Sequence, residues 1–319
     1  MHELTAVEIT KAVRSGRATC EAVTRACLER VAEREPSVLA WEYLDPGLAI
    51  AQARALATQT TGSTIKPGSF CGVFAYRPTF GDVRCSGVME SAASCDAIGL
   101  YARTIEDIAL HRDVLVGVEP EPLPNNVPAP RIGFVRPPQW SKLEPYTQDL
   151  LEDAARRLAH AGARVSEVAV PAEFQHAEEA HRLITCREFV VNFTREIEHH
   201  WEELSEDLRN GKIRTGLACS FERYRDARAL AERCRSALAA LFTDYDVLLA
   251  PSAVGEAPVG WNTGDSTLAS PWTLMHTPAM NVPVFKGPNG MPVGAQVIAA
   301  NGGDRKLFAA ARWIYQRLS

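Results

Sequence analysis

The sequence predicts an α/β fold in which a mixed β-sheet is flanked by helices. Short apolar runs such as RIGFV, DVLLAP and VGAQVIA have the length of buried strands. Longer segments with helical periodicity separate several of these runs, which is the alternation expected of α/β proteins. The chain has 319 residues, of which 46% are apolar and 23% charged, and this is enough for a substantial core. Because no internal repeat or low-complexity linker divides the chain, we expect one domain over residues 1–319.

The N-terminal part of the chain is expected to be helical. Thr5 and Glu8 have the spacing of a capping box, and Gly16 follows the end of the first helix. A second helix is expected over about residues 19–36. A third should cover about residues 45–57, because Asp and Pro at its start have the chemistry of a cap and a first turn.

The middle of the chain alternates between the two kinds of element. Thr104 and Asp107 predict the start of another helix. The run RIGFV is then expected to form a strand, residues 145–162 a helix, and ARVSEVAV, with its period-two pattern, a second strand.

The last part of the chain should begin with helices and end with strands. Residues 173–242 are mostly helical and charged, and Gly211 and Gly216 mark a break between two long helices. Strands are then expected at DVLLAP, MNVPVF and VGAQVIA, before a final amphipathic helix from about Asp304. The strands expected to share one core, although they come from distant parts of the chain, are those near Ile132, Val247, Val282 and Val297.

Composition argues against several classes of function. The formal net charge is -5 and no basic run occurs, so we expect no nucleic-acid partner. No segment reaches the ~20 apolar residues of a membrane span, and the N-terminus has no apolar core of signal-peptide length, so a cytoplasmic protein without a membrane partner is expected. The 8 cysteines occur singly. Their spacing forms neither a zinc site nor a disulfide pattern, so we expect them to stay reduced and unmetallated.

One segment has motifs that indicate chemistry. Taken alone, the loop TQTTGS is a polar turn, and a Ser after a Gly is more often a turn residue than a nucleophile. In this chain, however, TTGSTIKPGSFCG is followed by RPTFG, SCDAIG and ARTIEDIAL. The order and spacing of these motifs resemble the amidase signature family of amide-bond hydrolases. The similarity extends to LTAVEITKAVRSG near the start and to SPWTLMHTPAMNVPV and GMPVGAQVIA near the end, and it is weakest in the helical middle.

The resemblance implies a hydrolase that acts on a small-molecule amide without a metal or other cofactor. By position, Ser63 corresponds to the family's nucleophile, in a loop at the edge of the sheet. The backbone N–H groups of Thr60, Thr61 and Gly62 would form the oxyanion hole, which stabilises the negative charge that develops on the carbonyl oxygen. Two glycines of the family pattern are replaced, one by Thr61 and one by Ala75.

The family pattern also has a segment that this chain lacks. In the family, a Lys at the end of an early strand and a Ser in a Gly-Ser-rich loop relay the proton from the nucleophile. Here AQARALA runs directly into TQTTGS, so several core β/α units, on the order of a hundred residues, are missing. We therefore expect weak or no amide hydrolysis. The alternative is an inactive amidase-like protein that serves at most as a binding or interaction module.

The missing units leave two further questions. Loss of central strands should expose a sheet edge and apolar helix faces. These surfaces either stay uncovered or bind a second copy or another subunit, and the sequence leaves both alternatives open. A replacement base is also conceivable: Lys66 lies close to Ser63, although a neighbouring carboxylate or solvent is its expected partner, and His111 and His276 are further candidates.

Overall fold

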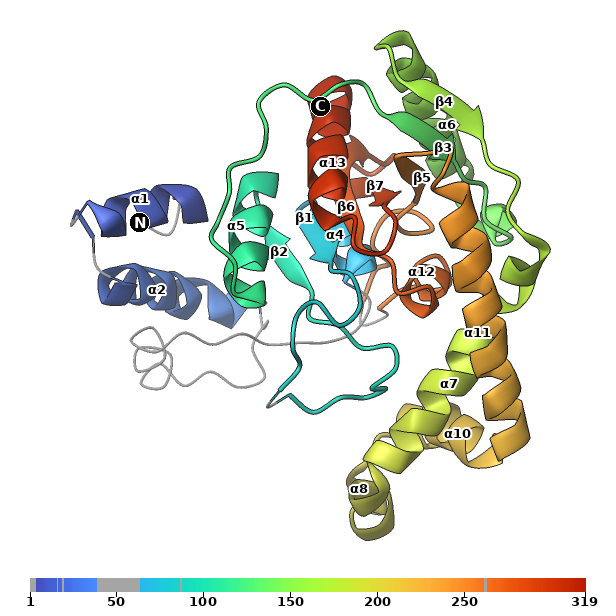
Figure 1. Ribbon diagram of the computed structural model, residues 1–319. Coiled ribbons are helices and arrows are strands. Elements are labelled where there is room, and N and C mark those ends of the chain that lie inside the picture. The colour runs from blue at the N-terminus through green and yellow to red at the C-terminus, as the bar shows by residue number, and fades with distance from the viewer. Residues whose placement is uncertain (1–3, 16, 19, 39–63, 87, 261–262) are drawn as a thin grey trace. The chain divides into compact units, whose positions relative to one another are not determined.

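The computed structural model describes residues 4–319 except 16, 19, 39–63, 87 and 261–262 (Figure 1). The chain divides into two compact units, residues 1–59 and 60–319. The described part of the first unit contains α1 (Ala6–Arg14) and α2 (Cys20–Val38).

The start of α1 confirms the predicted capping box. The backbone N–H of Thr5 donates to Oε2 of Glu8 at 2.8 Å, and the N–H of Glu8 donates to Oγ1 of Thr5 at 3.2 Å. The second helix runs two residues further than expected, because the chain stays helical past Pro36, which removes only one hydrogen-bond donor from the last turn. The helix predicted over residues 45–57 lies outside the described residues.

The second unit is built around a mixed β-sheet, as predicted. Among the described residues the sheet has seven strands in the order β2-β1-β6-β7-β5-β3-β4. β3 is parallel to β4 and to β5, and the other neighbouring strands are antiparallel. The strands are β1 (Phe74–Arg77), β2 (Leu100–Ala102), β3 (Arg131–Phe134), β4 (Arg164–Glu167), β5 (Val247–Pro251), β6 (Ala279–Lys286) and β7 (Pro292–Ile298).

Strands from distant parts of the sequence are neighbours in this sheet. In the antiparallel half, Ala75 of β1 pairs with Asn281 of β6, and in the parallel half Ile132 of β3 pairs with Val247 of β5. The β6-β7 hairpin lies between these two halves and joins them. The expectation that strands come together from both ends of the chain is therefore confirmed.

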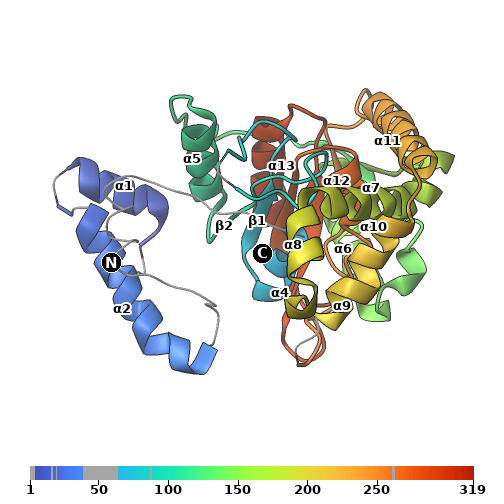
Figure 2. The same cartoon turned by 90° about the horizontal axis from the view of Figure 1, so that it is seen from below.

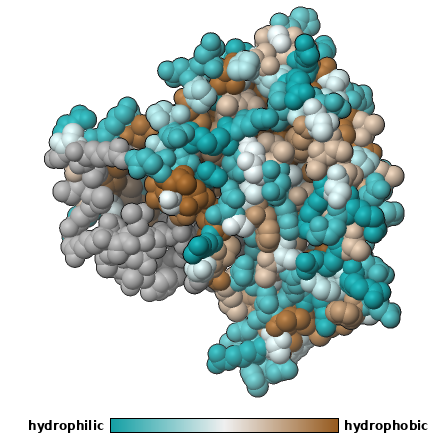
Figure 3. Space-filling model, in the orientation of Figure 1, coloured by the Kyte–Doolittle hydropathy of each residue, from teal (hydrophilic) through white to brown (hydrophobic). Residues whose placement is uncertain are grey.

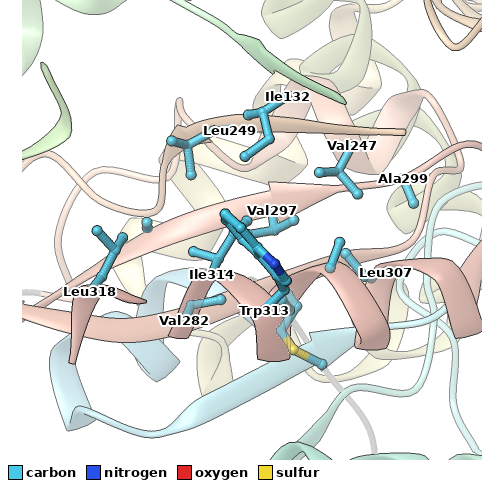
Figure 4. Close-up of a cluster of buried hydrophobic side chains, with 14 of the residues drawn as sticks. Ile132, Val247, Leu249, Val282, Val297, Ala299, Leu307, Trp313, Ile314 and Leu318 are labelled. Atoms are coloured by element: carbon cyan, nitrogen blue, oxygen red, sulfur yellow. The ribbon is translucent and has the colours of Figure 1, made fainter. Parts of the chain in front are cut away.

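Both faces of the sheet are buried under helices. Successive residues of β5 alternate between two apolar clusters, with Val247 and Leu249 in one and Leu248 and Ala250 in the other. The first cluster, part of which Figure 4 shows, also contains Ile132, Val282 and Val297, so the predicted common core is confirmed. Its helices are α5 (Ile105–Val116), α6 (Pro145–His160) and α13 (Asp304–Leu318).

The second cluster is covered by helices from the middle of the chain and by two short ones. These are α4 (Ile65–Cys71), α7 (Ala177–Asn192), α11 (Phe221–Leu241) and α12 (Ser270–Leu274). α7 and α11 pack side by side, which both ribbon views show (Figures 1 and 2). The helix start predicted at Thr104 is confirmed, since Oγ1 of Thr104 accepts a hydrogen bond from the N–H of Asp107 at 3.2 Å.

Short helices connect α7 to α11, as the two glycines predicted. They include a π-helix, η4 (Arg209–Ile213), and α10 (Arg214–Ala218). A Cβ added to Gly216 would lie 2.1 Å from the backbone O of Cys186, so only glycine lets α10 approach α7 this closely. By contrast, a Cβ added to Gly211 would meet no heavy atom within 4 Å. The remaining short helices are η1 (Trp140–Lys142), η2 (Ala172–His176), α8 (Thr194–His199), η3 (Trp201–Glu203) and α9 (Glu206–Leu208).

Cysteines and surface residues complete the description. The seven cysteines whose side chains the structure describes are free; Cys95, Cys186, Cys219 and Cys234 are buried. Among the described residues no group of three or more metal-binding side chains occurs, and no helix is long and apolar enough to cross a membrane. Figure 3 shows hydrophilic residues spread over the visible face, with smaller apolar patches among them.

Candidate functional site

The residues predicted to perform catalysis lie outside the part of the chain that the structure describes. This holds for Ser63 and for Thr60, Thr61 and Gly62. The described chain resumes at Thr64, which directly follows the predicted nucleophile in the sequence. Thr64 lines a pocket of about 380 Å³ in the second unit, and this pocket is the candidate functional site.

The pocket brings together the motifs on which the family resemblance rests. Its lining includes Thr64 from TTGSTIK, Arg77 from RPTFG, Asp96 from SCDAIG, and Thr273 from SPWTLMHTPAMNVPV. A Cβ on Gly99, the glycine of SCDAIG, would lie 2.2 Å from Oγ1 of Thr64, so this glycine lets its loop pack against Thr64. Four segments that are separate in sequence therefore form one wall.

Arg77, the last residue of β1, holds parts of this wall together. Its side chain is 6% exposed, and its Nη2 donates to the backbone O of Cys95 at 2.9 Å. The guanidinium also donates to the backbone O of Thr277 at 3.2 Å and of Thr273 at 3.4 Å. Burial lowers the pKa of Arg77 to about 10, so the side chain stays charged at neutral pH.

Two helices from the charged middle of the chain supply further polar groups. His181 and Thr185 of α7 and Lys212 of η4 line the pocket. Burial, together with the nearby charges of Arg77 and Lys212, lowers the pKa of His181 to about 4. The imidazole is therefore neutral at pH 7 and has little tendency to take up a proton. Oδ2 of Asp96 accepts hydrogen bonds from the backbone N–H groups of Ser91 at 2.6 Å and Ala92 at 2.9 Å.

None of the three proposed replacement bases is among the residues that line this pocket. Lys66 is 6% exposed, and its Nζ donates to the backbone O of Gly264 at 2.8 Å. The hydrogen-bond partner that the structure shows is a carbonyl, whereas the expected neighbouring carboxylate, that of Asp265, acts on the ammonium through its charge. Burial lowers the pKa of Lys66, and the charge of Asp265 opposes that change.

The two histidines considered from the sequence have other surroundings. His111 is exposed on α5. His276 has φ 63°, its ring stacks on Phe80 with centroids 4.0 Å apart, and Nε2 lies 2.8 Å from both Ser94 O and Arg235 Nη2. Burial lowers the pKa of His276 to about 4. These contacts suit a residue that fixes the start of SCDAIG, where Ser94 lies.

Sequence reasoning missed His181 and Lys212. Both come from the segment where the family resemblance is weakest, and nothing in their local sequence sets them apart from the other charges of that segment. By contrast, Arg77 and Asp96 lie inside motifs that the sequence had already singled out.

Comparison with known proteins identifies the family. The Amidase family model matches residues 47–308. A 2-amino-5-chloromuconic acid deaminase from Comamonas testosteroni is 28% identical over 276 residues, covering 81% of this chain and 59% of that protein. The A subunit of a glutamyl-tRNA(Gln) amidotransferase from a Cyanothece species is 27% identical over 289 residues, covering 76% of this chain and 60% of that protein. The chain thus spans about 60% of the length of these curated relatives.

A solved structure shares the fold. The crystal structure of an amidase superposes with a TM-score of 0.85 at 21% identity, covering 99% of this chain and all of that one. The family match extends over most of the sequence and includes the segments that form the pocket. The chain is therefore a member of the Amidase family.

Proposed function

We propose that this protein hydrolyses carbon–nitrogen bonds of small-molecule amides through an acyl-enzyme on Ser63, with a turnover lowered by the loss of the family's proton relay. The observation that carries the proposal is the pocket in which TTGSTIK, RPTFG, SCDAIG and SPWTLMHTPAMNVPV meet. Ser63 is the sequence neighbour of Thr64, a residue in the wall of that pocket, and this supports its role as the nucleophile.

The proposed chemistry is acyl transfer. The Oγ of Ser63 attacks the amide carbonyl carbon, and backbone N–H groups of Thr60, Thr61 and Gly62 stabilise the resulting oxyanion. The C–N bond then breaks, ammonia or an amine leaves with a proton, and water releases the carboxylate from the ester. No metal or cofactor is needed for these steps.

The proposed loss of turnover follows from the missing base. A serine hydroxyl is a weak nucleophile at neutral pH, and a positioned base contributes about 10²–10⁴-fold. Thr61 replaces a glycine in the oxyanion loop, and the loss of one donor there costs about 10²–10³-fold. The two deficits need not multiply, because groups that act as a unit are non-additive. The neutral His181 and the bonded Lys66 described above offer no obvious replacement.

The relatives support a further proposal about domains and partners. The family match over residues 47–308 crosses the boundary between the two compact units, which supports our proposal of one amidase-like domain over residues 1–319. That the chain spans about 60% of the length of the curated relatives supports the proposal that several β/α units are missing. The amidotransferase relative is by name one subunit of an enzyme, and β2 forms an edge of the sheet with Tyr101 47% exposed. We propose that this edge binds a second copy or another subunit. Light scattering that finds only monomer, and a pull-down without a stoichiometric partner, would contradict this.

The test of function is a panel of simple aliphatic and aryl amides assayed with purified protein. Ser63→Ala should abolish whatever hydrolysis is found, whereas Ser236→Ala, which removes an exposed hydroxyl on α11 that does not line the pocket, should leave it unchanged. Turnover unaffected by Ser63→Ala would remove the nucleophile assignment. Ordinary amidase turnover that Ser63→Ala abolishes would disprove the impairment, and Lys66 would be the first candidate base. No turnover with any amide would favour the binding module.

A further inference from the structure

The side chain of Lys212 lines the pocket and contacts uncharged groups there. Its Nζ donates to Oγ of Ser91 at 2.5 Å and lies 4.6 Å from the centroid of the Phe189 ring. In the part of the chain that the structure describes, no carboxylate oxygen lies within 4.0 Å of this ammonium. Burial lowers the pKa of Lys212, as expected for a partly desolvated cation that lacks an ion pair with any described residue.

Arg77, a second cation in the same pocket, also contacts uncharged groups. The hydrogen bonds of its guanidinium go to the backbone carbonyls of Cys95, Thr273 and Thr277, which do not neutralise its charge. A buried cation is costly unless a negative charge compensates it. Arg77 and Lys212 therefore leave the pocket with positive charge that the described chain does not neutralise within ion-pair distance.

The two carboxylates in the lining form no ion pair with Arg77 or Lys212, although the charge of Asp96 acts on both cations from a longer distance and partly offsets the effect of burial on their pKa values. Asp96 already accepts two backbone hydrogen bonds, from Ser91 and Ala92. Glu90 is only partly buried, and among the described ion pairs neither carboxylate is joined to Lys212 or Arg77.

The backbone around Lys212 fixes its position. Lys212 belongs to η4, and π-helical turns of this kind occur often at functional sites. The neighbouring α10 is held against α7 by the close approach at Gly216, and α7 supplies His181 to the same pocket. The ammonium is therefore carried by a packed element and not by a loose surface segment.

We propose that the pocket takes an amide whose other end is a carboxylate, and that Lys212 is the residue that binds this carboxylate. This inference rests on the proposed function, because it assumes that an amide occupies the pocket. An ammonium that donates a charge-assisted hydrogen bond to a carboxylate, in a partly desolvated site, distinguishes an anionic ligand from its neutral analogue.

The test is calorimetric titration of the purified protein with three probes of similar size: succinamate, the neutral succinamide, and the cationic β-alaninamide. Succinamate should bind at least about 10-fold more tightly than succinamide, since a hydrogen bond between charged groups has this effect on a dissociation constant. Lys212→Met should remove the preference, and Lys212→Arg should retain most of it. Lys286→Met, which removes an exposed charge at the end of β6, serves as the matched control and should change nothing.

Several results would overturn the inference. These are equal affinity for succinamate and succinamide, preference for β-alaninamide, absence of binding by all three probes, or a Lys212→Met variant that weakens both succinamate and succinamide by the same factor. Assaying hydrolysis of the same probes separates this inference from the proposed function. If the protein prefers succinamate but hydrolyses none of the probes, the carboxylate-binding role of Lys212 is supported and the proposed hydrolase function is contradicted. If it hydrolyses the probes without preferring succinamate, the hydrolase function is supported and the role of Lys212 is contradicted.

Discussion

The buried carboxylate of Asp304 should be one of the most sensitive positions for stability. Asp304 is 1% exposed in the first turn of α13. Its Oδ1 accepts hydrogen bonds from the hydroxyl of Tyr76 and from the N–H of Thr79 at 2.9 Å, and its Oδ2 accepts from Oγ1 of Thr79 at 2.5 Å. This group therefore ties α13 to the end of β1 and to RPTFG, next to the pocket wall.

The expected magnitudes follow from these contacts. Tyr76→Phe removes one hydrogen bond to a buried charge and should cost about 1.5–3 kcal/mol. Asp304→Asn should cost about 1–3 kcal/mol, the range expected when a buried hydrogen-bonding group loses its partner. The hydroxyl of Thr79 accepts a hydrogen bond from the N–H of Gly302 and donates its own hydrogen to Oδ2 of Asp304. In the Asp304→Asn variant an NH₂ group in place of Oδ2 would leave the hydroxyl hydrogen of Thr79 without an acceptor.

The assay is urea unfolding followed by tryptophan fluorescence, on wild type, both single variants and the double variant. Because the two side chains contact each other, the double variant should cost about 1–2 kcal/mol less than the sum of the single ones. Tyr315→Phe is the matched control, because no hydrogen bond of its hydroxyl is found among the described residues, and it should change stability by less than about 0.5 kcal/mol. Additive single effects, or a Tyr76→Phe cost as small as that of the control, would refute the reasoning.

Three further predictions follow from the packing and the pKa values. Gly216→Ala should destabilise the protein by about 1–3 kcal/mol, because its Cβ would meet the backbone of α7, whereas Gly211→Ala should be neutral or slightly stabilising; equal urea midpoints would contradict this. Stability should fall as the pH drops from about 6.5 to 4, because only the unfolded chain protonates His181 and His276 in that range; each histidine contributes up to about 3 kcal/mol, so replacing His181 by Gln should reduce the pH dependence of urea unfolding by about half, and an unchanged profile would contradict this. A thiol reagent should label the exposed Cys71 in the native protein but the buried Cys95, whose pKa burial raises to about 11, only after unfolding; equal labelling rates would show that this core opens.

Local features of the fold were predictable because they depend on neighbouring residues. The capping box at Thr5 and the cap at Thr104 were identified from side-chain chemistry at fixed spacing, and the buried strands from short apolar runs. The predicted strand ARVSEVAV is longer than β4, which pairs only over Arg164–Glu167. β4 is an edge strand, so its length is set by its single neighbour β3 and not by its own pattern.

The pocket was only partly predictable, for a different reason. The motif residues Arg77 and Asp96 are separated from Lys212 by more than a hundred positions, and only tertiary packing brings them to one cavity. A lysine in a charged helical segment usually faces solvent, so the uncharged contacts of Lys212 become informative only once its surroundings are known. The loop that contains Ser63 lies outside the described residues, and its role stays a prediction.

The order of strands in the sheet has a consequence for biosynthesis. β6 and β7 are the last strands to leave the ribosome, yet they occupy the middle of the sheet. Until they emerge, β1 has only β2 as a neighbour, and β5 has only β3, so the nascent sheet consists of two separate pieces with open edges. Pairing Ala75 with Asn281 closes a loop of about two hundred residues, which makes this a late and slow step. We therefore expect nascent chains that stop before β6 to depend on chaperones, because their unpaired strands are prone to aggregate.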